Sequence, residues 1–130
     1  MHASIVIATR NRWDLLNKLL ESLAPQLENR TDCEVIVVDD ASEFPAPFQG
    51  ELIVPRCTVL RLETPTGPSH ARNRGAAQAS GTLLLFLDDD GEVAEGWLDA
   101  MLAAEADNTL LLGNVVDFDG GRVQSLPRRS

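Results

Sequence analysis

The chain has 130 residues, 44% of them hydrophobic, so it can bury a single core, and we expect one domain spanning 1–130. Its formal net charge of −9 argues against nucleic acid as a partner, because broad nucleic-acid binding needs a basic surface. No stretch approaches the roughly 18 apolar residues of a membrane span, and the N-terminus lacks the basic and apolar regions of a signal peptide. We therefore predict a cytoplasmic protein with no transmembrane segment.

The first elements have the pattern of a strand followed by a helix. A β-branched apolar run at 4–8 predicts a buried strand. Asn11 is expected to cap a helix whose apolar residues recur at helical spacing over 13–23. Pro25 is expected to end this helix, because proline cannot donate the next backbone hydrogen bond.

Two further strands are predicted at 34–38 and, more weakly, at 58–62. Between them, the prolines and glycine of 41–55 argue against a regular helix and predict a loop with a short helical turn. Cys33 and Cys57 each open a predicted strand without metal-type spacing. Both are therefore expected to be buried thiols, not a disulfide or a metal site.

The second half continues the alternation of helices and strands. Ser69 is expected to cap a helix of small residues at 70–79, Gly81 to end it, and the most apolar strand to follow at 82–87. We then expect, in chain order, a helix at 97–106, a fifth strand at 110–112 and 115–116, and a turn at 119–122 into a sixth strand. This order predicts an α/β fold, with a mostly parallel sheet and helices on both faces.

Three consecutive aspartates, Asp88, Asp89 and Asp90, follow the most apolar strand. Two carboxylates 4 Å apart repel by about 4 kcal/mol at an effective dielectric of 20, so such a cluster favours a bound cation. Hard oxygen ligands favour Mg²⁺ or Mn²⁺. Alternation along the strand would place Asp88 and Asp90 on one face and Asp89 on the other. The alternative is a solvated acidic turn.

Ligands of parallel sheets bind beyond the carboxyl ends of the strands. In this chain that edge collects polar residues after three predicted strands: Thr9, Arg10 and Arg12, then Asp39 and Asp40, then Asp88 to Asp90. Arg10, Arg12, Arg72 and Arg74 are four of only eleven Lys and Arg residues, and they lie in two short connecting segments. This clustering suggests a small anionic ligand. No Gly-x-Gly-x-x-Gly or Walker-type loop supports a dinucleotide fold or a P-loop.

Four segments together resemble the family 2 inverting glycosyltransferases of the GT-A fold. They are Ser4–Arg12, Glu34–Ser42, Ala71–Gly75 and Phe86–Asp90, in the order and approximate spacing of that family. The resemblance covers essentially the whole chain apart from the proline-rich segment after Ser42. It implies a Rossmann-like nucleotide-diphospho-sugar transferase (GT-A) fold, of which this chain is expected to hold the donor-binding half and to end before the rest.

The resemblance also implies a ligand and a role for each site residue. The donor would be a nucleotide-diphosphate sugar of UDP, dTDP or GDP type, and the cofactor Mn²⁺ or Mg²⁺. Asp40 would accept a hydrogen bond from a uracil-type ring, and Asp90 would ligate the metal directly. The implied nucleotide-binding residues are Thr9, Arg10, Arg12, Asp39, Asp40, Arg72, Arg74, Asp88 and Asp89, and the implied metal ligands are Asp90 and Asp88.

Inverting transfer also needs a base that deprotonates the acceptor hydroxyl. In the family, the base and the acceptor site lie downstream of the aspartate segment. Asp117 and Asp119 come too early for that base, which we expect beyond Ser130, and the acceptor stays unknown. Two alternatives are open: a donor-binding module without catalytic activity, and a Mg²⁺-dependent phosphoacceptor domain of the receiver type. A receiver carries an acidic pair after its first strand, where this chain has Thr9 and Arg10.

Overall fold

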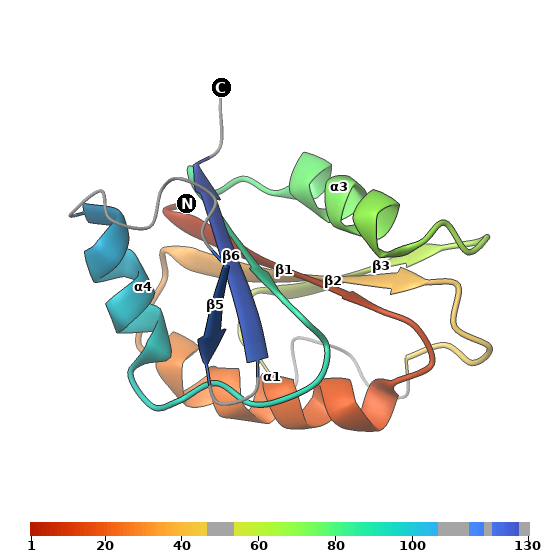
Figure 1. Cartoon of the computed structure of the whole chain (residues 1–130), viewed down its shortest axis with the longest axis horizontal. Coiled ribbons are helices and arrows are strands. Elements are labelled where there is room, and N and C mark those ends of the chain that lie inside the picture. The colour runs from red at the N-terminus through yellow and green to blue at the C-terminus, as the bar shows by residue number, and fades with distance from the viewer. Residues whose placement is uncertain (47–53, 107–114, 119–120, 128–130) are drawn as a thin grey trace.

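The computed structural model describes residues 1–46, 54–106, 115–118 and 121–127. Within these ranges the backbone forms one six-stranded sheet of order β3-β2-β1-β4-β6-β5 (Figure 1). The strands are β1 (Ala3–Thr9), β2 (Cys33–Asp40), β3 (Cys57–Leu62), β4 (Leu83–Leu87), β5 (Val115–Phe118) and β6 (Gly121–Pro127). The helices are α1 (Trp13–Leu27), α3 (Pro68–Gln78) and α4 (Trp97–Ala106). Strands β3, β2, β1 and β4 are parallel, and β6 runs antiparallel to both β4 and β5.

Helices cover both faces of the sheet, as predicted. Figure 1 shows α3 on one face and α1 on the other, with α4 at the side of the sheet that carries α1. The larger core cluster joins α1 and α4 to alternate strand residues such as Ile5 and Ile7, and the smaller cluster joins α3 to Ile36 and Val38. Burying each such side chain contributes about 1.5–3 kcal/mol. Because both faces are buried, the strands read as nearly continuous apolar runs.

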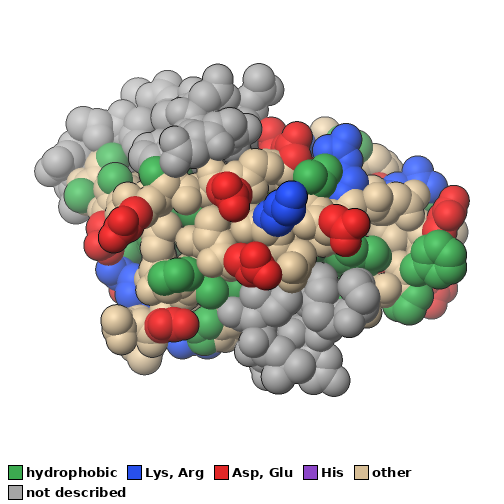
Figure 2. Space-filling view, turned by 90° about the horizontal axis from the view of Figure 1, so that it is seen from below, with side chains coloured by type: hydrophobic (Ala, Val, Ile, Leu, Met, Phe, Trp, Pro, Cys, Tyr) green, Lys and Arg blue, Asp and Glu red, His purple; other side chains and the backbone are tan. Residues whose placement is uncertain are grey.

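Carboxylates dominate the charged side chains on the outer face that carries α1. Figure 2 shows acidic side chains scattered over this face, with fewer basic ones between them. The picture agrees with the net charge of −9.

Strand and core predictions hold for the described residues. The strands predicted at 4–8, 34–38, 58–62 and 82–87 are confirmed, and so is the helix at 97–106. Cys33 and Cys57 are buried thiols that are not joined in a disulfide, also as predicted. Burial raises the pKa of the Cys33 thiol, and the neighbouring Asp32 carboxylate adds to that rise.

The predicted ends of α1 are wrong. Arg12, not Asn11, precedes the helix, because Asn11 adopts a left-handed φ of 57° and turns its side chain to another loop. Pro25 lies inside the helix, which runs one further half-turn to Leu27. Leu27 is fully buried, and its carbonyl accepts a 2.7 Å hydrogen bond from the guanidinium of Arg56. These tertiary contacts hold the last residues in spite of the missing proline N–H.

The predicted ends of α3 are wrong as well. The helix starts at Pro68, and Gly67, with a φ of 93°, takes the capping position that we had expected for Ser69. Proline suits the first helical position because its missing N–H would have no partner there. The helix ends at Gln78, before Gly81. A Cβ on Gly81 would lie 2.6 Å from the backbone nitrogen of Ser4, so this glycine serves a close approach of two chain segments.

Some predictions concern residues outside the described ranges. The loop predicted at 41–55 is free of helix and strand over 41–46, and 47–53 lies outside. The fifth strand is confirmed at 115–118, and 110–112 lies outside. The sixth strand is confirmed from Gly121 onward, whereas 119–120 of its predicted turn also lies outside.

Helix α3 lies close to the sheet because small residues line its inner face. Ala71 and Gly75 are one turn apart and both buried. A Cβ on Gly75 would stand 2.5 Å from Cγ1 of Val6 and 2.9 Å from Cγ2 of Val38. Valine side chains are stiff about χ1, so they could not turn aside cheaply. Gly75 therefore sets the distance between α3 and the two central strands.

We expect Gly75→Ala to destabilise the protein by about 1–3 kcal/mol, because the added methyl group overpacks the interface with Val6 and Val38. Helix propensity alone would give the opposite sign, since alanine is favoured over glycine by about 0.5–1 kcal/mol. Urea unfolding measures the difference. The matched variant Asn73→Ala, on the exposed face of the same helix, is expected to be neutral or slightly stabilising. Stabilisation by Gly75→Ala would contradict the close packing.

Candidate functional site

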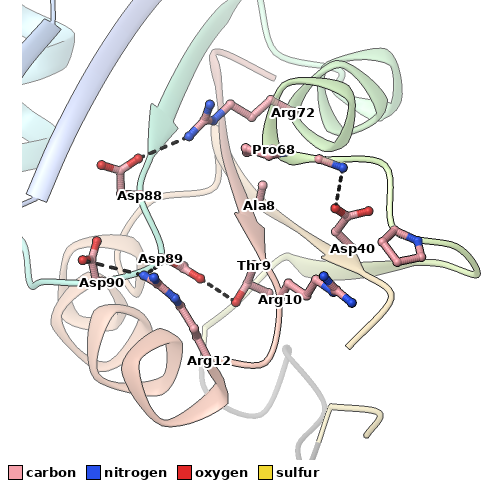
Figure 3. A pocket seen from close by; sticks show the side chains of 12 residues that line it. Ala8, Thr9, Arg10, Arg12, Asp40, Pro68, Arg72, Asp88, Asp89 and Asp90 are labelled. Carbon is pink, nitrogen blue, oxygen red and sulfur yellow. Dashed lines mark hydrogen bonds and ion pairs between the residues drawn. The ribbon is translucent and has the colours of Figure 1, made fainter. Parts of the chain in front are cut away.

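A cavity of about 500 Å³ opens at the carboxyl edge of the parallel strands. Strand β1 lies between β2 and β4 and is parallel to both, so the three strand ends meet there. The chain leaves β1 toward β2 on one side and later returns to β4 on the other, which makes this edge the switch point where α/β sheets bind ligands. The lining residues, most of them labelled in Figure 3, are Ala8, Thr9, Arg10, Arg12, Asp40, Pro65, Gly67, Pro68, Arg72, Asp88, Asp89 and Asp90.

The three aspartates have different partners. Asp88 pairs with Arg72 of α3 at 3.3 Å. Asp89 accepts hydrogen bonds from the Thr9 hydroxyl at 2.9 Å and from Arg12 at 3.3 Å. Asp90 lies 3.8 Å from the same arginine nitrogen. Strand β4 ends at Leu87, and in Figure 3 Asp89 points toward Thr9 while Asp88 and Asp90 point away from it.

Exposure separates these carboxylates further. The side chain of Asp89 is only 12% exposed, against 36% for Asp88 and 51% for Asp90. Burial raises the pKa of Asp89 and outweighs the Thr9 hydrogen bond and the charge of Arg12, while the neighbouring Asp90 adds to the rise. Asp89 is therefore a fixed part of the pocket wall, whereas Asp88 and Asp90 are accessible to a ligand.

The carboxylates fit a metal that is shared with a ligand better than a metal caged by protein. No group of three or more His, Cys, Asp or Glu side chains within the described ranges is arranged to hold a metal ion. Mg²⁺ sites for phosphorylated substrates commonly use one or two carboxylates, with phosphate oxygens and water completing the shell. The accessible Asp88 and Asp90 supply this kind of donor set.

Asp40 organises the loop that leads into α3. Its carboxylate accepts hydrogen bonds from the backbone N–H of Thr66 at 2.8 Å, the Thr66 hydroxyl at 2.9 Å and the backbone N–H of Gly67 at 2.8 Å. Burial works to raise the pKa of Asp40, but these bonds and the charge of Arg10 outweigh it and lower the pKa. A carboxylate has about four acceptor positions, so one is left beyond these three hydrogen bonds.

Asp39 and Arg74 do not line the cavity. Asp39 is 1% exposed and accepts hydrogen bonds from Arg61 at 2.6 Å and from the backbone N–H of Ser42 at 2.9 Å. These two hydrogen bonds hold the loop that follows β2, away from the cavity lining. Arg74 is exposed on α3. The other predicted site residues, Thr9, Arg10, Arg12, Asp40, Arg72, Asp88, Asp89 and Asp90, are brought together around the cavity.

A second loop fixes the segment that carries Arg10 and Arg12. The hydroxyl of Ser42 accepts a 2.8 Å hydrogen bond from the backbone N–H of Asn11, and the side-chain oxygen of Asn11 accepts one of the same length from the N–H of Glu43. Sequence reasoning missed this contact and the loop at Thr66. The Gly67-Pro68 pair just before a helix was the available signal for the second of these.

Together the sheet order and the cavity define an α/β domain with a ligand site of nucleotide-binding type. The model for "Glycosyl transferase family 2" matches residues 4–130. The chain therefore belongs to glycosyltransferase family 2, as the sequence resemblance predicted. The phosphoacceptor alternative is excluded by this assignment.

Relatives and solved structures agree with the family. The uncharacterized glycosyltransferase YwdF of Bacillus subtilis is 37% identical over 101 residues, which are 78% of this chain and 37% of that protein. Polypeptide N-acetylgalactosaminyltransferase 5 of Caenorhabditis elegans is 31% identical over 126 residues, covering 88% of this chain and 19% of that protein. This chain thus spans well under half the length of these relatives.

The crystal structure of S. aureus TarS 1-349 superposes with a TM-score of 0.72 at 32% identity, covering 82% of this chain and 33% of that one. The complex of the same protein with UDP-GlcNAc gives a TM-score of 0.68. These neighbours confirm the predicted GT-A fold. Among the described residues, no helix is both long and apolar enough to span a bilayer.

We expect Asp40→Asn to destabilise the protein by about 1–3 kcal/mol at pH 7, because the amide NH₂ would face backbone donors that now bind a carboxylate. The lowered pKa of Asp40 makes this contribution fully present above its ordinary pKa of 3.8, and it is lost as the pH falls through the lowered folded value. Urea unfolding of wild type and Asp40→Asn gives the free energy of unfolding of each. The difference between the two should therefore be smaller at pH 3 than at pH 7.

The matched variant Asp99→Asn removes a carboxylate that is 79% exposed and pairs only with Arg30 among the described residues. Its effect is expected to stay within about 0.5 kcal/mol. An Asp40→Asn effect as small as that of Asp99→Asn would argue against the role of Asp40 in holding the loop.

Proposed function

We propose that this chain forms the donor site of an inverting glycosyltransferase, binding a nucleotide-diphosphate sugar together with Mn²⁺ or Mg²⁺. The observation that carries the proposal is the cavity at the switch point, where arginines from two elements face the three aspartates after β4. The TarS complexes with UDP and UDP-GlcNAc support a donor of this class. UDP, dTDP and GDP sugars all fit this description.

The base of the nucleotide would lie at the β2 side of the cavity. Ala8 and Pro65 offer apolar surface there, and Asp40 keeps one acceptor position. A carboxylate accepts from a ring N–H, which uracil, thymine and guanine possess. Arg10 stands beside Asp40 and is exposed, so it can reach the base or the ribose.

The diphosphate would lie between Arg12 and Arg72, beside Asp88 and Asp90. Three arginines and four aspartates line the cavity, so its formal charge is −1. A diphosphate brought to a negative cavity needs added positive charge, and a divalent ion held by Asp90 and Asp88 would supply it. When bound, such an ion stabilises the charge that develops on the leaving diphosphate. Thr9 would keep Asp89 oriented beside it.

The acceptor and the catalytic base stay outside this assignment. No catalytic base is assigned among the described residues, and we expect this base downstream of Ser130, as the family resemblance implies. Donor binding is accordingly the property to test first. A donor-binding module without transfer activity shares this site, so the two alternatives differ only in transfer.

We expect the chain to bind UDP more tightly with Mn²⁺ than without it, and Asp90→Asn to weaken the metal-dependent binding at least tenfold, or about 1.4 kcal/mol. Calorimetry gives both affinities, and thermal shift checks them because a ligand of the native state raises its stability. Glu92→Gln is the matched control, since it removes an exposed carboxylate two residues away that does not line the cavity. Equal metal dependence in Asp90→Asn and wild type would remove Asp90 from the site.

A further inference from the structure

Arg12 stands between two of the three aspartates. One guanidinium nitrogen, Nη1, lies 3.3 Å from Oδ1 of Asp89 and 3.8 Å from Oδ2 of Asp90 (Figure 3). The arginine side chain is 51% exposed, as is that of Asp90. A single positive charge therefore faces two carboxylates at the open side of the cavity, and the three groups together stay negative.

The contact of Arg12 with Asp89 is stronger than its contact with Asp90. Asp89 is largely buried and is also held by the Thr9 hydroxyl, so its geometry does not depend on Arg12 alone. Asp90 is half exposed, and Arg12 is its ion-pair partner within the described part of the chain. An exposed pair of this kind is weak and easily exchanged for another cation.

The backbone of Arg12 is anchored while its side chain is accessible. The Arg12 carbonyl accepts the first hydrogen bond of α1, from the N–H of Leu16 at 2.9 Å. The preceding Asn11 is tied to Ser42. Movement of the guanidinium thus needs only side-chain rotation, and the same cavity that holds Asp90 lies open to it.

We propose that Arg12 is the built-in counterion of Asp90, which a divalent metal must displace, and that the displaced guanidinium pairs with the diphosphate of the donor. This proposal rests on the proposed function. Metal alone gains Asp90 but meets the repulsion of the nearby guanidinium, which then keeps only its contact with Asp89. When the diphosphate is also present, the guanidinium gains a second anionic partner, and this favours metal and diphosphate together. Arg12 thereby makes metal binding depend on the nucleotide.

The test compares Mn²⁺ binding with and without UDP in wild type and in Arg12→Ala. Without UDP, Arg12→Ala is expected to bind Mn²⁺ up to about fivefold more tightly, the factor that corresponds to the upper end of the range for exposed ion pairs. With Mn²⁺ present, the same variant is expected to bind UDP several-fold more weakly, since a phosphate contact is lost. Tighter Mn²⁺ binding in the first titration together with weaker UDP binding in the second would show that Arg12 exchanges Asp90 for the diphosphate.

Arg10→Ala is the matched control, because it removes the same charge from the same cavity beside Asp40 instead of Asp90. Its Mn²⁺ affinity without UDP is expected to change less than twofold. Arg12→Gln, which keeps most of the side chain, should behave like Arg12→Ala. Weaker or unchanged Mn²⁺ binding by both Arg12 variants would overturn the proposal, as would equal tightening by Arg10→Ala.

The two proposals fail in distinguishable ways. If wild type shows no metal-dependent UDP binding, the proposed donor site fails, whatever Arg12 does in the titration with Mn²⁺ alone. If wild type binds UDP with Mn²⁺ and the Arg12 variants do not gain Mn²⁺ affinity, the donor site stands and the exchange is overturned.

Discussion

Mutual repulsion among the carboxylates that follow β4 is the constraint on which this site depends. Three successive aspartates cannot share one small volume without positive charge, and the chain supplies that charge from two separate elements. Arg72 comes from α3 and meets Asp88, whereas Arg12 precedes α1 and meets Asp89 and Asp90. The aspartates are thus divided between partners, and the most buried of them is the one that also has a neutral hydroxyl donor.

Two features far from the aspartates bring these arginines into place. The small inner face of α3, with Gly75 against Val6 and Val38, lets the helix lie close enough for Arg72 to reach across β1 toward β4. On the other side, buried Asp39 holds Ser42, and Ser42 holds the backbone of Asn11. Both features use residues that touch no ligand site directly. Their contribution is to fix the distance between opposite charges, which decides how strongly those charges interact.

Sequence patterns predicted the sheet well and the element ends poorly, for one physical reason. A strand such as β1 is buried on both faces, so its apolar run is visible in the residues themselves. Asn11 looks like a helix cap locally, yet its side chain bonds a loop more than thirty residues away, and Pro25 is tolerated because Leu27 is buried. In the site, too, local patterns were visible in the sequence and contacts between distant segments were not. Strand ends predicted which residues gather, but not that Asp40 would bind the loop at Thr66 and Gly67.

That contact links the two ends of the cavity. Asp40 holds Gly67, Gly67 precedes α3, and α3 carries Arg72 to Asp88, so one continuous set of contacts runs from the β2 edge to the aspartates. The hydrogen bonds of Asp40 to backbone N–H groups and the body of the helix do not deform easily. A nucleotide that spans the cavity would therefore meet a base end and a phosphate end whose separation is set by the fold. Preorganisation of this kind lowers the entropy cost of binding. Arg12 differs from the rest of the cavity, because its backbone is anchored while its half-exposed side chain can rotate and change partners.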